Sequence, residues 1–337
     1  MSPAPLLDVR DLHVRFHTRD GVRHAVNALR FDLARGEVLG ILGESGSGKS
    51  VALRALMGML PRERTEVTGS VRFDGGELMG RDETAMRRLR GARIAMIFQE
   101  PMTALDPVFP VGEQIAETIV RHEGGSRRDA MRRSRELFEL VQIPSAERRL
   151  KAYPHELSGG MRQRAMIALA LSCRPDLLLA DEPTTALDVT VQIQIIMLLR
   201  RLQLEFGMAV IFVTHDIGVA AEMSDRLAVM YAGRFVETGP AATVIEAPRH
   251  PYTEGLLAST VHGSMRGRRL EAIPGMPPDL IALPRGCAFA PRCRHATDAC
   301  RADEPAAVAM EPDHVTRCRR VAAGEITLYS PTLGVDA

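Results

Sequence analysis

Residues 43–50 constrain the fold of this chain more than any other feature. They read Gly-Glu-Ser-Gly-Ser-Gly-Lys-Ser and match the pattern G-x-x-x-x-G-K-[ST]. The apolar run 38–42 before them predicts a buried strand, and residues 51–60 after them predict a helix that ends before Pro61. Glycines allow successive backbone N–H groups to turn inward around phosphate oxygens at a helix N-terminus. The segment therefore predicts a phosphate-binding loop between a strand and a helix.

The residues of this loop have distinct expected roles. Lys49 would reach the β- and γ-phosphates of ATP, and the Ser50 hydroxyl would bind Mg²⁺. Lysine occurs only at Lys49 and Lys151 in the whole chain, and its compact ammonium suits a tight loop where arginine does not fit. A plain Gly-Ser turn with a solvated lysine is the alternative, and the flanking strand and helix argue against it. The residues expected to bind the nucleotide here are Gly43, Glu44, Ser45, Gly46, Ser47, Gly48, Lys49 and Ser50.

The first half of the chain mixes strand and helix signals. Residues 6–42 alternate apolar and polar positions, with a turn near Asp20-Gly21, which predicts short antiparallel strands. Residues 68–74 predict another strand. Helical periodicity follows in residues 113–143, with a break at Gly124-Gly125, and in residues 162–172.

The second half predicts a parallel sheet. Residues 177–180, 210–213 and 227–230 are short apolar runs typical of buried parallel strands. A long amphipathic helix begins near Val189 and ends at Gly207. Strands that alternate with helices indicate the α/β class.

Two carboxylates stand at the end of the first of these strands. Asp181 would hold the Mg²⁺ shell, directly or through water, and Glu182 could polarise the attacking water as general base. A strand that ends in Asp-Glu is by itself more often an ordinary solvated loop. The phosphate-binding loop in the same chain favours the catalytic interpretation.

Three single polar residues fit the same site. Gln99 follows the strand 93–98 and could meet Mg²⁺ and the lytic water, and His215 follows the strand 210–214 and could contact the γ-phosphate and Glu182. Asp188 is placed to cap the helix that begins near Val189. Each could also be a surface glutamine, a strand-end histidine or a simple cap.

The stretch 156–164 reads Glu-Leu-Ser-Gly-Gly-Met-Arg-Gln-Arg, a Ser-Gly-Gly turn that opens a helix. With the other motifs it resembles the ATP-binding cassette family, over roughly residues 6–245. The resemblance implies a P-loop NTPase (RecA-like) parallel-sheet core, an N-terminal antiparallel β subdomain and an inserted helical subdomain. It also implies that the turn binds the γ-phosphate held by another cassette. The residues that it assigns to this turn are Ser158, Gly159 and Gly160.

Further family roles follow from the same resemblance. Lys49 and Ser50 correspond to Walker A, and Asp181 and Glu182 to Walker B. The remaining correspondences are Gln99 to the Q-loop, Asp188 to the D-loop, His215 to the switch histidine and Phe16 to the aromatic residue that stacks on adenine. For Phe16 the spacing is looser, and a core position is nearly as consistent.

Finer features resemble the dipeptide/oligopeptide importer ATPases. Met161 stands where the signature usually has Gln. Residues 99–107 read Gln-Glu-Pro-Met-Thr-Ala-Leu-Asp-Pro, with Asp106 where these ATPases usually carry Asn. The run His-Pro-Tyr-Thr at 250–253 and a cysteine-containing tail support the same group. In segment 99–112, we expect Met102, Leu105, Val108 and Phe109 to offer an apolar contact surface.

The resemblance implies ATP hydrolysis that drives uptake of di- or oligopeptides. The implied partners are a second, non-identical cassette, two transmembrane permease subunits and an extracytoplasmic substrate-binding protein. Nickel and glutathione importers share this subunit type, so the cargo stays open. A soluble cassette ATPase of DNA repair or translation is disfavoured because the chain has neither a coiled-coil insertion nor a second cassette. A P-loop kinase would lack the Ser-Gly-Gly turn.

Charge and hydropathy restrict the partners and the location. Lys+Arg 43 against Asp+Glu 42 leaves a net charge of +1, which argues against nucleic acid as a partner. No apolar run approaches the roughly 18–20 residues that span a bilayer, and the N-terminus does not read as a secretory signal. We expect a peripheral protein at the cytoplasmic face of the cell (inner) membrane.

The chain changes character near residue 250, where prolines, glycines and cysteines become frequent. We therefore expect an ATP-binding domain over residues 1–250, with its helical subdomain at about 100–160, and a C-terminal extension over residues 251–337. The extension carries Cys287, Cys293, Cys300 and Cys318.

This C-x5-C-x6-C-x17-C spacing fits zinc poorly, because zinc cysteines usually stand closer in pairs. Four thiolates can hold a [4Fe–4S] cluster, which the resemblance favours, and free or structural cysteines remain the alternative. We expect Arg285, Arg292 and Arg294 to lower the pKa values of these thiols. His295 and His314 are possible substitute ligands. Cys173 is expected in the core.

Overall fold

The computed structural model describes residues 4–185, 187–259 and 272–329, and the contacts divide the chain into two compact units. The first unit contains residues 33–37 and 80–213, together with the described residues before Leu7. The second contains residues 7–32, residues 38–79 and the described residues from Thr214 onward. Each unit is described by itself below.

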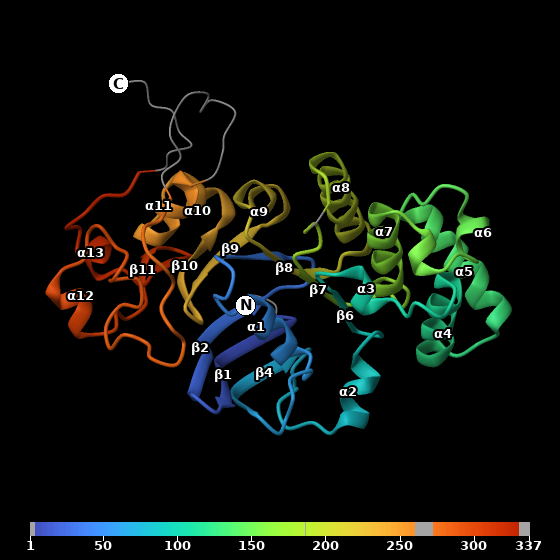
Figure 1. Ribbon diagram of the computed structural model, residues 1–337, viewed down its shortest axis with the longest axis horizontal. Coiled ribbons are helices and arrows are strands. Elements are labelled where there is room, and N and C mark those ends of the chain that lie inside the picture. The colour runs from blue at the N-terminus through green and yellow to red at the C-terminus, as the bar shows by residue number, and fades with distance from the viewer. Residues whose placement is uncertain (1–3, 186, 260–271, 330–337) are drawn as a thin grey trace. The chain divides into compact units, whose positions relative to one another are not determined.

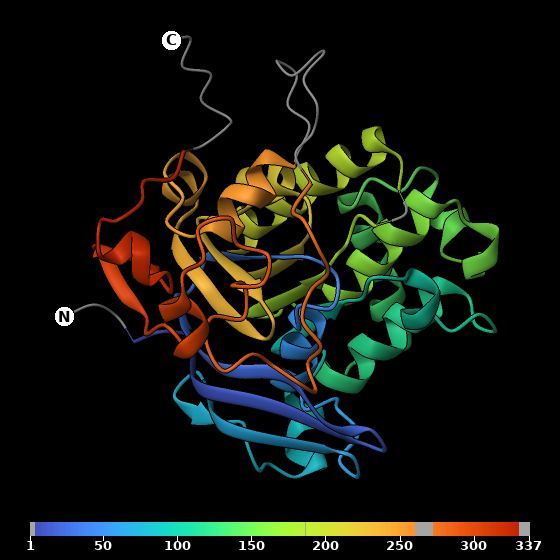
Figure 2. The ribbon, with the colours of Figure 1, turned by 60° about the vertical axis from the view of Figure 1, so that its left-hand side comes forward.

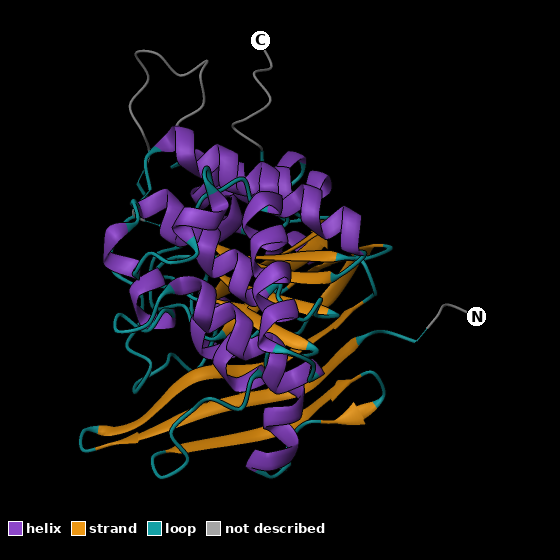
Figure 3. Ribbon diagram, turned by 90° about the vertical axis from the view of Figure 1, so that its right-hand side faces the viewer, coloured by secondary structure: helices purple, strands orange, loops and turns teal. Residues whose placement is uncertain are grey.

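An antiparallel sheet in the second unit confirms the expected N-terminal strands, although the first two are long, with 12 and 13 residues, and not short as predicted. Its strand order is β2-β1-β4-β5, and Figure 3 shows the long strands side by side. The turn between the first two strands lies at residues 19–20, close to the predicted Asp20-Gly21. The strands are β1 (Leu7–Thr18), β2 (Gly21–Leu33), β4 (Thr65–Phe73) and β5 (Gly76–Glu77).

Another set of strands in the same unit has the order β11-β12-β10-β9-β3. The pairing of β3 with β9 is parallel, and the other pairings are antiparallel. Figure 2 shows the C-terminal segments, in orange and red, beside these strands. The strands are β3 (Val38–Leu42), β9 (Arg226–Tyr231), β10 (Arg234–Pro240), β11 (Val308–Glu311) and β12 (His314–Thr316).

The helix after the phosphate-binding loop is shorter than the sequence predicts. It begins at Lys49 and ends at Leu56, not at residue 60, because Gly58 takes a left-handed conformation with φ of 60° that closes the last turn. The helices of the second unit are α1 (Lys49–Leu56), α9 (Ile217–Met223), α10 (Ala241–Glu246), α11 (Pro251–Ala258), α12 (Asp298–Ala302) and α13 (Arg319–Ala322).

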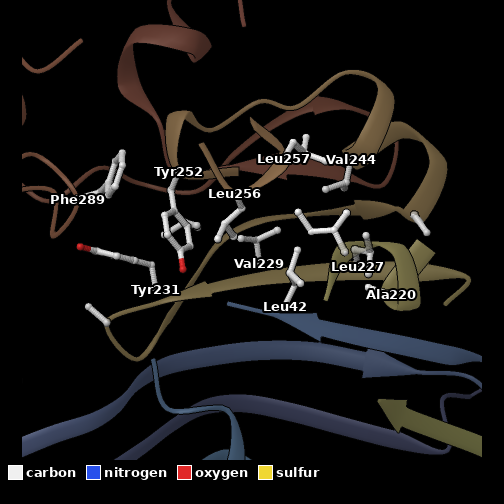
Figure 4. Close-up of a cluster of buried hydrophobic side chains, with 14 residues drawn as sticks. Leu42, Ala220, Leu227, Val229, Tyr231, Val244, Tyr252, Leu256, Leu257 and Phe289 are labelled. Atoms are coloured by element: carbon white, nitrogen blue, oxygen red, sulfur yellow. The ribbon is translucent and has the colours of Figure 1, made fainter. Parts of the chain in front are cut away.

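One buried cluster joins residues on both sides of position 250. Leu42 from β3 and Val229 from β9 lie in the same cluster as Tyr252 and Leu256 from α11 and as Phe289, as Figure 4 shows. Because apolar burial is the main source of stability, residues after 250 contribute to the core beneath the phosphate-binding loop. The domain boundary near residue 250 stays a prediction.

The first unit contains the strands β6 (Ile94–Ile97), β7 (Leu177–Asp181) and β8 (Ala209–Thr214), which pair in parallel in the order β8-β7-β6. Every residue of these strands is buried, as expected for a sheet covered on both faces. The helix α8 (Val189–Phe206) begins and ends where the sequence predicts, with Gly207 at φ of 62° as its cap.

The helices of this unit include a packed group. The helices α4, α5 and α7 contact one another, and Figure 1 shows them together in green. The predicted break falls at Gly124 and Gly125, both at positive φ. The remaining bounds are α2 (Glu83–Leu89), α3 (Pro101–Ala104), α4 (Val111–Glu123), α5 (Arg127–Leu140), α6 (Ala146–Arg149), the 3-10 helix η1 (Pro154–Glu156) and α7 (Gly159–Ala170). Among the described residues, no helix has the length and apolar character needed to cross a bilayer.

Candidate nucleotide site

The phosphate-binding loop connects β3 to α1 in the second unit. Gly46 and Gly48 have φ values of 79° and 109°, which allow the backbone to curl around a central space. A Cβ at Gly43 would lie 2.3 Å from the carbonyl oxygen of Met230, and one at Gly48 would lie 2.3 Å from that of Ala25. The loop is therefore packed against neighbouring backbone at both ends, and only glycine fits at these two positions.

Polar groups line the loop. The side chain of Lys49 is buried, and its Nζ donates to the carbonyl oxygens of Gly43 and Glu44 at 2.7 and 2.9 Å. The Ser47 hydroxyl is also buried and has no hydrogen-bond partner among the described residues. A buried cation, an unpartnered hydroxyl and a helix N-terminus make a donor set that fits phosphate oxygens. Ser45 is exposed and Ser50 is half-buried.

Two residues from the C-terminal part of the chain contact Glu44 in this loop. The Arg292 guanidinium donates from Nη1 to Glu44 Oε2 at 2.6 Å and from Nη2 to Oε1 at 3.0 Å. The Glu44 N–H donates to the Tyr252 hydroxyl at 2.9 Å. The paired carboxylate raises the pKa of Arg292 above its usual range. These contacts span more than 200 residues of sequence, so no local pattern could have revealed them.

The two predicted acidic residues lie at the end of β7 in the first unit. Asp181 is buried, whereas Glu182 is half-buried and adopts φ of 46°, a strained value for a residue with a side chain. The Glu182 N–H donates to the carbonyl of Val213 at 3.0 Å. The Thr185 hydroxyl donates to Glu182 Oε2 at 2.9 Å, and Gln99 Nε2 lies 3.5 Å from the same oxygen. The structure therefore brings Gln99 and Glu182 together, and it adds Thr185, which sequence reasoning missed.

The Ser-Gly-Gly turn lies at the start of α7, where Ser158 is exposed and Gly159 and Gly160 are half-buried. Ser158 caps this helix, and its Oγ accepts from the N–H of Met161 at 3.3 Å. A Cβ at Gly160 would lie 3.0 Å from Val191 on the neighbouring α8. Exposed donors at a helix N-terminus leave this turn able to contact an anion on another molecule.

The remaining predicted residues are distributed over both units. Asp188 caps α8 in the first unit, as expected, with Oδ1 accepting from the N–H of Val191 at 2.9 Å. His215 is exposed in the second unit, and Phe16 is half-buried on β1. Because Glu182 and His215 belong to different units, their contact stays a prediction. The same holds for a Mg²⁺ shared by Ser50 and Asp181.

The apolar surface predicted for segment 99–112 is present except for one residue. Met102, Val108 and Phe109 are exposed, whereas Leu105 is only 2 % exposed. The assignment of Leu105 to a contact surface was therefore wrong, because this side chain is buried in the first unit. Gln114 holds the segment with bonds to Asp106 at 2.8 and 2.9 Å.

The four tail cysteines line one small cavity in the second unit. Burial raises the pKa of Cys287 to about 11 and also raises those of Cys293 and Cys318. The expectation that Arg285, Arg292 and Arg294 would lower the thiol pKa values is therefore wrong for these three residues. Arg292 and Arg294 bind carboxylates instead, at Glu44 and Glu254. The cysteines of this set are Cys287, Cys293, Cys300 and Cys318.

The potential ligands around the four cysteines were expected to include His295 and His314. Among the described residues, no three or more His, Cys, Asp or Glu side chains lie close enough to hold a single ion. His295 lines the same cavity, whereas His314 is bonded to Glu237 at 2.8 Å. Cys173 is buried, as expected.

Comparisons with known proteins agree with this geometry. A family model for "ABC transporter" matches residues 26–185, and one for "Oligopeptide/dipeptide transporter, C-terminal region" matches residues 236–300. The chain is 50 % identical over 332 residues to a putative peptide import ATP-binding protein of Brucella melitensis, covering 95 % of this chain and 98 % of the relative. It is 50 % identical over 320 residues to the oligopeptide transport ATP-binding protein OppD of Salmonella typhimurium, covering 94 % and 95 %.

Solved structures show the same fold. An ATP-binding cassette, solved as a dimer in a post-hydrolysis state with ADP and Pi, matches with a TM-score of 0.63 and 27 % identity, covering 70 % of this chain and 98 % of that one. The protein cbiO1 of Clostridium perfringens matches with a TM-score of 0.61 and 28 % identity, covering 72 % and 91 %. The predicted α/β P-loop class is confirmed. The chain belongs to the ABC transporter family, among the ATP-binding proteins with the oligopeptide/dipeptide transporter C-terminal region.

Proposed function

We propose that this chain is the ATP-hydrolysing subunit of an ABC importer that takes up di- and oligopeptides. One observation carries the proposal. Tyr252 and Arg292, which lie in the region that matches the oligopeptide/dipeptide transporter model, form hydrogen bonds with the phosphate-binding loop. We also propose an ATP-binding domain over residues 1–250, with a helical part at about 100–160, and an extension over residues 251–337.

Nucleotide binding rests on the loop and on β1. Lys49 and Ser47 donate to the β- and γ-phosphates, and Phe16 stacks on adenine. Ser50, Gln99 and Asp181 provide oxygen ligands for Mg²⁺, which neutralises phosphate charge when bound.

Hydrolysis rests on Glu182 as general base for the attacking water. The Thr185 hydroxyl holds the Glu182 carboxylate at 2.9 Å, so that one oxygen keeps a fixed direction. Gln99 orients the water, and His215 contacts the γ-phosphate. The buried Asp181 is the last residue of β7, and Glu182 follows it directly.

A second, non-identical cassette completes each ATP site. The turn formed by Ser158, Gly159 and Gly160 binds the γ-phosphate held by that partner, and Asp188 lies at the contact between the two cassettes. The exposure of Ser158 at the start of α7 supports the assignment, because it leaves this side chain accessible to another molecule.

Transport requires membrane partners. Segment 99–112, with Met102, Val108 and Phe109 exposed, contacts one of two permease subunits and places the chain at the cytoplasmic face of the inner membrane. An extracytoplasmic binding protein delivers the peptide. Closure of the two cassettes then drives the permeases as a translocase.

The substitution Glu182→Gln tests the enzymatic part of this proposal. It keeps shape and hydrogen bonding but removes the base, so ATP binding should persist while kcat falls by about 100-fold or more. The control is Glu139→Gln on the exposed face of α5, which should leave kcat unchanged. Near-normal turnover in the assembled transporter with Glu182→Gln would overturn the assignment.

The tail cysteines hold a [4Fe–4S] cluster in this proposal. Cys287, Cys293, Cys300 and Cys318 line one cavity, and such a cluster would act as a structural cross-link among distant segments. Protein purified without oxygen should be brown and contain about four irons per chain. A colourless protein, or one that contains zinc, would contradict the cluster.

A further inference from the structure

The contact between Arg292 and Glu44 joins the phosphate-binding loop to the C-terminal part of the chain. Two parallel N–H···O bonds of 2.6 and 3.0 Å join the guanidinium to the carboxylate. The Arg292 side chain is only 4 % exposed, and that of Glu44 is 29 % exposed. A paired fork of this kind fixes the orientation of both groups and is stronger than a neutral hydrogen bond.

Arg292 is itself held rigidly. Its Nε donates to the carbonyl of Pro274 at 2.9 Å, and its guanidinium carbon lies 5.8 Å from the ring centroid of Tyr231 and 6.0 Å from that of Phe289. Three contacts other than the one with Glu44 therefore orient this side chain. A pre-positioned cation can set the place of a loop instead of following it.

Tyr252 provides a second contact to the same loop residue. Its hydroxyl accepts the Glu44 N–H, and its ring packs 4.6 Å from that of Tyr231 and 5.4 Å from that of Phe289, between centroids. Figure 4 shows the three aromatic rings at one end of the buried cluster. The backbone and the side chain of Glu44 are thus both tied to the C-terminal part of the chain.

The segment that carries Arg292 also carries two of the cysteines. Successive turn bonds run from Ala290 N–H to the Cys287 carbonyl at 2.9 Å and from Arg292 N–H to the Phe289 carbonyl at 3.0 Å. Cys293 follows Arg292 directly. The fold of this cysteine segment therefore determines where the guanidinium stands.

We infer that Arg292 is a positioning residue for ATP binding, through which the cysteine segment sets the charge and the conformation of the phosphate-binding loop. The inference rests on the proposed ATPase function. Glu44 places a negative charge in a loop that must receive a triphosphate, and its own carbonyl oxygen accepts from Lys49 at 2.9 Å. Arg292 neutralises that charge and fixes the direction of the carboxylate with its two hydrogen bonds.

The test compares Arg292→Met, Glu44→Gln and the double variant in the purified full chain. Arg292→Met leaves the carboxylate unpaired, so the Kd for a fluorescent methylanthraniloyl-ATP should rise about tenfold or more. KM for ATP should rise more than kcat falls. In the double variant no charge remains to be neutralised, so most of the loss of affinity should disappear. If Arg292 acted in folding alone, Arg292→Met would lower the affinity for ATP equally in the wild-type chain and in the Glu44→Gln variant.

Arg294→Met is the matched control. Arg294 lies in the same segment and binds Glu254 at 2.8 Å, and its hydrogen bonds among the described residues go to His295 and Glu254 and not to the phosphate-binding loop. This variant should keep the wild-type Kd. Arg292→Lys keeps the charge but loses the fork, so its affinity should lie between those of wild type and Arg292→Met, and it serves if Arg292→Met does not fold.

The outcomes separate the two proposals. The inference would be overturned by an unchanged Kd in Arg292→Met, or by an equal loss of ATP affinity in Arg292→Met and the double variant. In either case, ATP binding by the wild-type chain would still support the proposed ATPase function. Failure of the wild-type chain to bind methylanthraniloyl-ATP would instead contradict the proposed function itself.

Discussion

The Thr185 hydroxyl donates a hydrogen bond of 2.9 Å to Oε2 of Glu182, the carboxylate proposed as general base. The two residues are three apart, and the bond closes a turn directly after β7. Glu182 has φ of 46° at this turn, so the backbone conformation and the Thr185 hydroxyl together orient its side chain.

Replacing Thr185 by valine should therefore reduce catalysis. The variant preserves the shape of the side chain but removes the donor, and we expect kcat to fall about tenfold, as for the loss of one hydrogen bond to a charged group. The Kd for ATP should stay close to wild type, because Thr185 is not proposed to contact the nucleotide. Steady-state ATPase assays measure kcat and a nucleotide titration measures the Kd, with the exposed Thr84→Val as control. An equal loss in the control would contradict the role of Thr185.

Alanine at Gly48 should abolish nucleotide binding. The new Cβ would lie 2.3 Å from the Ala25 carbonyl at φ of 109°, so the loop must shift. Gly46 has φ of 79° with no neighbour within 4 Å of a Cβ, so Gly46→Ala should cost only about 1–2 kcal/mol. Thermal unfolding and ATP titration of both variants distinguish steric conflict from simple strain. Equal losses of stability and ATP affinity in the two variants would argue against a steric conflict at Gly48.

Alanine at Ser158 should impair hydrolysis of the ATP that the partner cassette binds. It should not affect ATP binding by the chain that carries the substitution. Ser158 and Ser126 both cap helices, so each Ser→Ala variant should lose about 1 kcal/mol of stability. Only Ser158→Ala should lower turnover of the assembled transporter, while ATP affinity of the isolated chain is unchanged. Weakened binding in the isolated chain would show that the turn acts within its own subunit.

Aspartate at Phe109 should uncouple ATP hydrolysis from transport. Phe109 is 55 % exposed, so the substitution should not change the thermal unfolding midpoint. Uptake of a labelled tripeptide by the reconstituted transporter should fall, whereas ATPase activity of the isolated chain should not. Met276→Asp, at a position 86 % exposed, is the control. Normal uptake with Phe109→Asp would remove this segment from the permease contact.

Local sequence was sufficient for the elements and for most of the proposed site residues. The turn near residue 20, the break at Gly124-Gly125 and the end of α8 at Gly207 all follow from backbone preferences that act over a few residues. The phosphate-binding loop is likewise a local pattern. Its helix was predicted too long because the left-handed turn at Gly58 precedes the more conspicuous Pro61.

Other features depended on packing between distant segments. Leu105 was expected on the surface but is buried, and Arg292 and Arg294, which were expected to lower the thiol pKa values, bind carboxylates instead. Neither outcome has a local signal, because burial and ion pairing are decided by whichever groups the fold brings into contact.

The sequence alone determined that this chain contains a P-loop, two acidic residues at a strand end and a Ser-Gly-Gly turn that opens a helix. Each of these motifs is formed by residues that are adjacent in the sequence. Only the tertiary structure decided that Glu44 of that loop is held by Arg292 and Tyr252. A bond between residues 248 positions apart arises from chain folding and buried charge pairing, and neither can be read from neighbouring residues.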